Sequence, residues 1–406
     1  MADIFMIKMD FVQTMAFASV LYWLGVNLCR RVKFLIRYNI PPAVAGGLLF
    51  AVLRLALGSR VAFEFDLTLL EPFMIAFFTT IGLGASVGLM KRGGRIAFKL
   101  LLAAAALALL QNAAALAIGG FTGLPPALAV LAGSATMTGG HGTGLVFADE
   151  IGKVFGLAGV QATAIACATF GVVAGSLLGG PLAERLIKGR SLAREVNLET
   201  GYRKNMIPDV FSFGDRGEEI NTHSILMTIF QITFAVSVGM WLGGALGERN
   251  IFIPAYAIAL TAGVLLRNLG DRVNFLRVNP RIVKHISGAC LSFFLAFALM
   301  SVDLSQLKDL AAPLLAILLF QTLLMAVFAF YVTFPLTGGD YQAAVIASGH
   351  AGFGLGATPN AIANMEAVCA KYGMATDAFF AVAAVGAFFI DIVNVVVINV
   401  LIKMFA

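Results

Sequence analysis

The sequence predicts an all-α polytopic membrane protein made of two inverted-topology repeats, each with about five transmembrane helices plus one re-entrant hairpin. Composition points to the membrane, because 60% of the 406 residues are hydrophobic and 12% are charged. Soluble domains carry roughly 25% charged residues. The mean hydropathy is +0.91. Two glycine-rich segments interrupt this apolar sequence at corresponding places, which predicts the hairpins. The net charge of +6 is attributed to basic loops and not to nucleic-acid binding.

Apolar runs long enough to cross a bilayer as helices recur along the chain. They lie at 10–29, 40–58, 72–90, 98–120, 157–183, 222–247, 252–268, 286–302, 310–336 and 376–402. The polar stretch 184–221, with seven Lys/Arg and seven Asp/Glu, separates two halves. We therefore expect a first repeat at 1–183, a cytoplasmic linker at 184–221 and a second repeat at 222–406.

Short motifs recur in the same order in both halves. The pairs are IP at 40–41 and 253–254, FF at 77–78 and 293–294, and LLQN at 109–112 with LFQT at 319–322. The glycine motif GGHGTG at 139–144 has a partner in GFGLGATPN at 352–360. The shared order predicts that the halves have a common plan.

The basic residues predict the orientation of the chain. Twenty of the 28 Lys/Arg lie after the first, third and seventh runs and in the linker. Cytoplasmic loops are enriched in Lys and Arg, and all twenty face the cytoplasm if segment 127–148 enters and leaves by the same face. That segment is therefore expected to be re-entrant, which inverts the second half and places both termini and the loop near Ser305–Asp309 outside. The repeat extends the same expectation to 342–370.

A re-entrant hairpin places half-helix ends near the middle of the bilayer, where N-terminal N–H groups can hold a carboxylate and unwound carbonyls can ligate sodium. Thr358 is expected to be a helix N-cap before Pro359, with Thr143 in the matching place. The alternative is that the glycines only permit close helix packing. The substrate-binding candidates are Gly139, Gly140, His141, Gly142, Thr143, Gly354, Gly356, Ala357, Thr358 and Asn360.

Asp391 is the acid that lies well inside a span, so it is expected to pair with a cation or a substrate ammonium. The alternative is a buried acid that caps backbone groups. Asn394 lies one turn away, on the same helix face. The cation-binding candidates are Thr138, Asp391, Asn394, Gln111 and Gln321. Interhelical hydrogen bonds explain the mid-span polar residues nearly as well.

No catalytic residue is expected. His141 and His350 are more readily explained as hydrogen-bonded structural groups than as a proton relay. The cysteines show no metal-ligand spacing. No cofactor is expected, and sodium is the metal ion anticipated.

The two glycine motifs, AIANM at 361–365 and GAFFIDIVN at 386–394 together resemble the bacterial sodium/glutamate symporter family, as does PPAVAGGLL at 41–49. The likeness covers nearly the whole chain apart from 184–221. It implies an inner-membrane importer of L-glutamate with sodium as the coupling ion and two re-entrant hairpins. It also implies a homodimer in which the hairpin-bearing bundle moves against a fixed scaffold.

The sequence is therefore interpreted as a sodium-coupled importer of L-glutamate that works by alternating access of the elevator type. The first alternative is a sodium- or proton-coupled transporter of another organic anion, such as a di- or tricarboxylate. A less favoured alternative is an intramembrane enzyme, which lacks a convincing nucleophile or metal triad. A channel is the third, and no sequence feature indicates a continuous pore.

Overall fold

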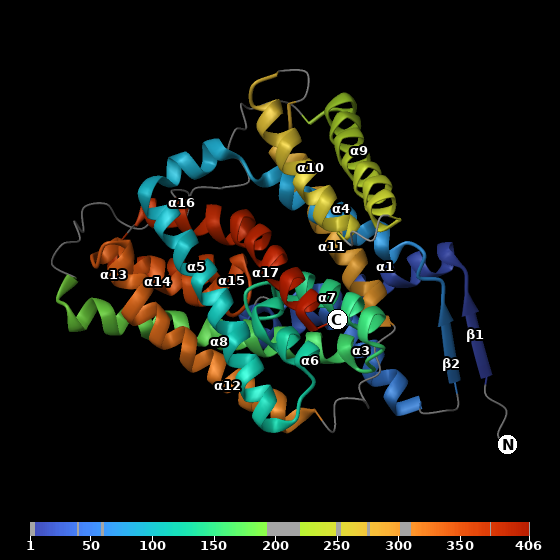
Figure 1. Ribbon diagram of the computed structural model, residues 1–406, viewed down its shortest axis with the longest axis horizontal. Helices are drawn as coiled ribbons and strands as arrows, with labels where there is room; N and C mark the ends of the chain where they lie inside the picture. The colour runs from blue at the N-terminus through green and yellow to red at the C-terminus, as the bar shows by residue number, and fades with distance from the viewer. Residues whose placement is uncertain are drawn as a thin grey trace. The chain divides into compact units, whose positions relative to one another are not determined.

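The computed structural model describes residues 5–38, 40–57, 61–192, 220–248, 253–273, 277–300, 310–373 and 375–405. Most of these residues are helical (Figure 1). Seven helical segments within them are long and apolar enough to cross a membrane: Phe11–Arg31, Gly93–Thr122, Val160–Gly189, Thr222–Leu246, Pro280–Met300, Ala311–Thr337 and Thr376–Phe405. The prediction of an all-α polytopic membrane protein is thereby confirmed. Most of the linker and the loop near Ser305–Asp309 lie outside the described residues.

Three expected spans are short helices: α3 (Pro42–Leu57), α4 (Leu70–Gly84) and α10 (Ala255–Gly270). At 1.5 Å per residue they cover about 22–24 Å, less than the roughly 30 Å of a typical hydrocarbon core. The expected run 72–90 is wrong at its C-terminal end, because α4 ends at Gly84 and the next helix begins at Val87. The turn is held by Ser86, whose hydroxyl donates to Asp271 Oδ2 over 2.7 Å.

A two-stranded parallel sheet was not predicted. Strand β1 (Phe5–Met9) pairs with β2 (Val61–Phe65), and Lys8 lies opposite Glu64. Their side chains form an ion pair of 2.8 Å. The rings of Phe63 and Phe65 contact Phe50. The sheet thus extends the hydrophobic core to which Phe50 of α3 belongs.

The chain forms two compact units, and the first comprises Met1–Ser86 and Phe211–Lys308. Its described helices from the first half are α1 (Phe11–Arg31), the short α2 (Lys33–Arg37), α3 and α4, and those from the second half are α9 (Thr222–Gly247), α10 and α11 (Pro280–Met300). Small residues let the backbones approach closely. A Cβ on Gly263 of α10 would lie 2.6 Å from the Thr79 carbonyl of α4.

The second unit comprises Val87–Val210 and Asp309–Ala406. From the first half it has α5 (Val87–Thr122), α6 (Pro126–Val130) with a π-helical turn at Leu131–Ala135, α7 (Gly140–Phe155) and α8 (Val160–Gly189). From the second half it has α12 (Ala311–Phe328), a π-helical turn at Ala329–Thr333, α13 (Phe334–Thr337), α14 (Tyr341–Gly354), α15 (Thr358–Tyr372), α16 (Thr376–Ala384), a π-helical turn at Val385–Phe389 and α17 (Ile390–Phe405). Both glycine segments therefore belong to this unit.

Helices of the two halves pack in corresponding pairs inside the first unit. Helix α1 packs on α3 as α9 packs on α10, and α4 packs on α10 as α11 packs on α3. Each compact unit takes helices from both sides of the linker. The units therefore do not coincide with the two expected repeats, since each half contributes to both.

Candidate substrate and ion site

Both glycine segments are helices broken in the middle. In the first, the turn Thr136–Gly139 separates the π-helical end at Ala135 from α7. Gly140 has a φ of +61°, a left-handed conformation that glycine adopts without steric cost. In the second, Leu355–Ala357 separates α14 from α15, which pack against one another. Ala357 is extended, with a φ of −158° and a ψ of 162°.

The two breaks meet. A Cβ on Gly140 would lie 2.7 Å from the Gly356 carbonyl oxygen, closer than real side chains approach. A Cβ on Gly356 would in turn lie 3.0 Å from Val172 Cα of α8. Glycine is needed at both places because another backbone occupies the space. The tips of the two segments are therefore side by side next to α8.

Gln111 of α5 links the two breaks. Its amide nitrogen donates to the Gly354 carbonyl over 2.7 Å, at the end of α14. Its amide oxygen accepts from the Thr138 hydroxyl over 2.7 Å, in the turn of the first segment. Gln321 of α12 donates to the Gln111 carbonyl over 2.7 Å. Three of the expected cation-binding residues thus form one buried group.

Ser134 is the centre of a second group. Its N–H donates to Asn112 Oδ1 over 3.1 Å, and its hydroxyl accepts from Asn112 Nδ2 over 2.7 Å. Its carbonyl accepts from Asn394 Nδ2 over 3.0 Å and also from the N–H groups of Thr138 and Gly139. Side chains from α5 and α17 therefore satisfy the unwound backbone of the first segment, which would be costly to leave unpaired in a membrane.

Asp391 lies in the first turn of α17, directly after the π-helical turn Val385–Phe389. Its side chain is half-buried and makes no hydrogen bond or ion pair within the described part of the chain. Asn394, one turn further, joins it to the Ser134 group. The carboxylate is thus placed beside the first break without a protein partner among the described residues.

The expected N-caps are wrong. Helix α15 begins at Thr358 with Ala357 as its cap, and the Thr358 hydroxyl donates to the Gly386 carbonyl over 2.6 Å. Helix α7 begins at Gly140, so Thr143 lies inside it. Each helix therefore starts earlier than expected, and neither start has a side-chain cap hydrogen bond.

The second segment is fastened to α8 by asparagines. Asn360 donates to the Val172 carbonyl over 3.0 Å and to the Ser176 hydroxyl. Asn364 donates to the Gly175 carbonyl over 2.9 Å. Asn360 therefore lies against a helix of the same unit, and its amide nitrogen is used in that contact.

The two histidines are held by threonines. His141 Nε2 lies 3.0 Å from the Thr169 hydroxyl, and His350 Nδ1 lies 2.8 Å from the Thr333 hydroxyl. Both side chains are buried. His350 also packs on Phe353, with ring centroids 4.8 Å apart. These contacts fit the structural role expected for the histidines.

Sequence reasoning missed Ser134 and Ser176. Both are small hydroxyl residues next to glycine, at Gly133 and Gly175, in segments that otherwise read as apolar. A serine beside glycine at a predicted helix break could have indicated Ser134. No local signal distinguishes Ser176 from a serine that bonds its own helix.

The chain is similar to known transport proteins over almost its whole length. The profile of the sodium/glutamate symporter family matches residues 7–374. The chain belongs to the sodium/glutamate symporter family. It is 40% identical over 396 residues to the sodium/glutamate symporters of Escherichia coli (strain K12) and Shigella flexneri, which covers 97% of this chain and 98% of each relative. It is 37% identical over 391 residues to the symporter of Haemophilus influenzae, with 96% of each chain covered.

Membership of this family confirms the resemblance and the prediction of a transporter instead of an enzyme. The broken helices, the breaks that touch and Asp391, whose carboxylate has no partner among the described residues, belong to the compact unit that carries both glycine motifs.

Proposed function

We propose that the chain imports L-glutamate together with sodium across the bacterial inner membrane. The observation that carries the proposal is the meeting of two broken helices at Gly140 and Gly356 in a chain of this family. Symporters of the family are named for sodium and glutamate. The substrate and the coupling ion are assigned here from those names together with the site.

The substrate carboxylates bind at the N-termini of α7 and α15. Helix N-termini carry a partial positive charge and free N–H groups, which suit carboxylates. Both helices begin at the breaks, at Gly140 and Thr358. The glycines leave room for the ligand to approach the backbone.

Sodium binds to oxygen atoms of the groups around Gln111 and Asn394. The buried Gln321 Oε1 and Asn394 Oδ1 have no hydrogen-bond partner within the described part of the chain. Asp391 adds a carboxylate one turn from Asn394. Unwound backbone and oxygen-bearing side chains are the ligands that discontinuous helices offer to sodium.

Transport follows an elevator-like alternating access, with the second compact unit as the moving part. That unit contains both broken segments, whereas the described helices of the first unit are continuous across their length. Two inverted repeats account for the corresponding helix pairs of the two halves. We further propose a homodimer, with both termini outside and the linker in the cytoplasm.

The second candidate is a transporter of another organic anion. Asp391 favours glutamate over citrate, because an amine-free substrate gives this carboxylate a role with a cation alone. In this alternative, sodium is the sole partner of the Asp391 carboxylate.

Uptake into proteoliposomes tests the proposal. Purified protein would be reconstituted and given radiolabelled glutamate, aspartate or citrate, with and without an inward sodium gradient. We expect glutamate to accumulate against its gradient only with sodium. Uptake of citrate in preference to glutamate, or accumulation of glutamate that ignores sodium, would overturn the assignment.

A further inference from the structure

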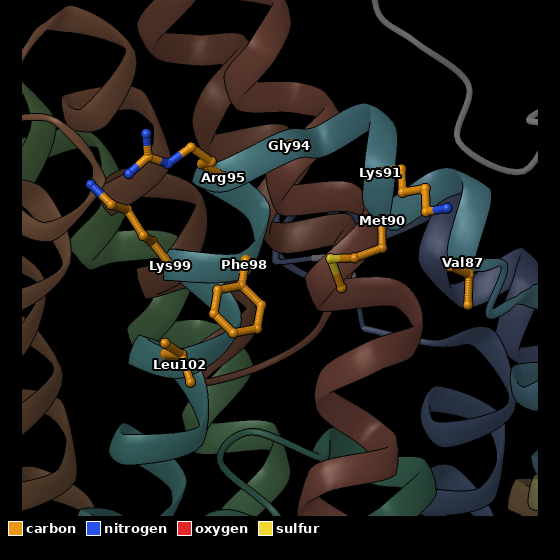
Figure 2. Close-up of a pocket in the computed structure, with 8 residues that line it drawn as sticks. All are labelled: Val87, Met90, Lys91, Gly94, Arg95, Phe98, Lys99 and Leu102. Atoms are coloured by element: carbon orange, nitrogen blue, oxygen red, sulfur yellow. The ribbon is translucent and has the colours of Figure 1, made fainter.

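The start of α5 carries an exposed hollow that the candidate site does not use. Its volume is about 570 Å³, and it is lined by Val87, Met90, Lys91, Gly94, Arg95, Phe98, Lys99 and Leu102. All of these residues belong to the second compact unit. Figure 2 shows Arg95 and Lys99 reaching to one side of the bent helix and Lys91 lying on the other side of the bend. Met90 and Phe98 lie between them in this view.

The hollow exists because α5 is bent at Gly94. The backbone there has a φ of +61° and a ψ of −151°, which no helix contains. A Cβ at Gly94 would meet nothing within 4 Å. The bend separates the short first part of α5 from the part that crosses the membrane, Gly93–Thr122.

The basic side chains of the hollow have no counter-charge among the described residues. Lys91, Arg95 and Lys99 make no ion pair within the residues that the structure describes. Arg95 and Lys99 are one helical turn apart, where like charges repel one another. An anion in the hollow would remove this repulsion.

The lining becomes apolar along the helix. Phe98 is 57% exposed and Leu102 is 52% exposed. The two residues lie one turn apart in the membrane-crossing part of α5. A ligand that fits this arrangement carries a negative headgroup and apolar chains. Basic pockets at the membrane surface recognise anionic lipid headgroups through Lys and Arg.

We propose that the hollow at Gly94 binds an anionic phospholipid. The phosphate lies between the cations and the acyl chains lie along Phe98 and Leu102. The proposal depends on the chain being a membrane protein and not on its substrate. Its failure is therefore distinguishable from failure of the proposed transport function.

Thermal unfolding of the full chain in detergent micelles tests the proposal, with dioleoyl-phosphatidylglycerol or dioleoyl-phosphatidylcholine added in a titration. A ligand that binds the folded state raises the unfolding midpoint. We expect phosphatidylglycerol to raise it more than phosphatidylcholine does. In Arg95→Gln the apparent affinity for phosphatidylglycerol should fall about fivefold, and in the triple variant of Lys91, Arg95 and Lys99 to Gln on the order of a hundredfold.

The matched control replaces Arg30, Arg31 and Lys33 with Gln, since these exposed residues form another basic cluster at the end of α1. This control should keep the full response to phosphatidylglycerol, and native mass spectrometry should show the bound lipid. If the triple variant does not fold, the single variant Arg95→Gln still tests whether the hollow binds phosphatidylglycerol. An unchanged response in both hollow variants, an equal loss in the control, or the same response to inorganic phosphate alone would overturn the proposal.

Discussion

At the scale of single residues, polar side chains of the membrane-spanning helices replace the backbone hydrogen bonds that the broken segments lack. Ser134 uses its N–H, hydroxyl and carbonyl at once. Gln111 uses both ends of its amide. Because water is absent in the bilayer core, a backbone group left without one of these bonds would cost several kcal/mol. A few side chains therefore hold the site together, and removing one of them should lower stability and transport.

Replacement of Gln111 by Met should lower stability and abolish uptake. The variant keeps the length of the side chain but leaves the buried Thr138 hydroxyl and the Gly354 carbonyl without their partner. Each unsatisfied group costs about 1–3 kcal/mol. The unfolding midpoint in detergent and glutamate uptake would be measured together. Thr322→Val is the control, because the Thr322 hydroxyl donates to the Leu318 carbonyl of its own helix. Equal behaviour of the two variants would contradict the role given to Gln111.

Asp391→Asn should fold but lose sodium-driven accumulation of glutamate. If Asp391 ligates sodium, the remaining glutamate binding should lose its dependence on sodium. If it pairs with the amine, glutamate affinity should fall while amine-free dicarboxylates are less affected. Calorimetric titrations at several sodium concentrations separate the two cases. The exposed Asp377, at the start of α16, provides the control variant Asp377→Asn. Unchanged sodium dependence, affinity and uptake in Asp391→Asn would leave this aspartate a structural role.

At the scale of elements, the functional features are breaks in helices. Two segments unwind at glycine. One π-helical turn ends at Ala135, directly before the break of the first segment, and another precedes Asp391. Such π-turns commonly occur at functional sites. Where the two breaks meet, glycine is required for space at Gly356 and for backbone conformation at Gly140. The elements thus bring the ends of two half-helices together.

Side chains added at the tips should therefore impair transport. Gly140→Ala forces an alanine into a left-handed conformation, which costs roughly 1–2 kcal/mol, and sets its Cβ against Gly356. We expect glutamate uptake to fall about tenfold or more, and Gly356→Val to abolish it. Gly180→Val of α8 is the control, because a Cβ there meets nothing within 4 Å. Full transport by both tip variants would return these glycines to a packing role.

At the scale of the whole molecule, the chain is divided between two compact units that each draw on both halves. In the part of the chain that the structure describes, one unit consists of continuous helices and a small sheet. The other contains the broken helices, Asp391 and the lipid hollow. This division gives a physical basis for the proposed elevator, since one packed body can carry the complete site.

The proposed orientation can be checked by labelling single cysteines with an impermeant thiol reagent. The native Cys29, Cys167, Cys290 and Cys369 are buried, so background labelling should be low. Met6→Cys, on the exposed strand β1, should be labelled in intact cells. Gly201→Cys, in the linker, should be labelled only after the membrane is opened. Labelling of Gly201→Cys from outside would reverse the topology.

Local sequence alone decides the membrane class, the seven long spans, the two broken segments and the family. These follow from hydropathy, from glycine content and from motifs, each of which is confined to a short window. The helix ends were less accurate, as at Gly84 and Gly140, because a backbone turn can end a helix without a diagnostic side chain. The sheet of β1 and β2 was missed because its strands are 56 residues apart in register.

The tertiary structure decides which polar groups meet. Gln111 reaches Gly354 across 243 residues, and Asn394 reaches Ser134 across 260. No periodicity or motif specifies such partners, since they depend on how helices from both halves pack. The same packing brings Gly140 against Gly356 and leaves Asp391 without a partner among the described residues. A hydrogen bond depends on a few tenths of an ångström, and this precision comes from the packed fold.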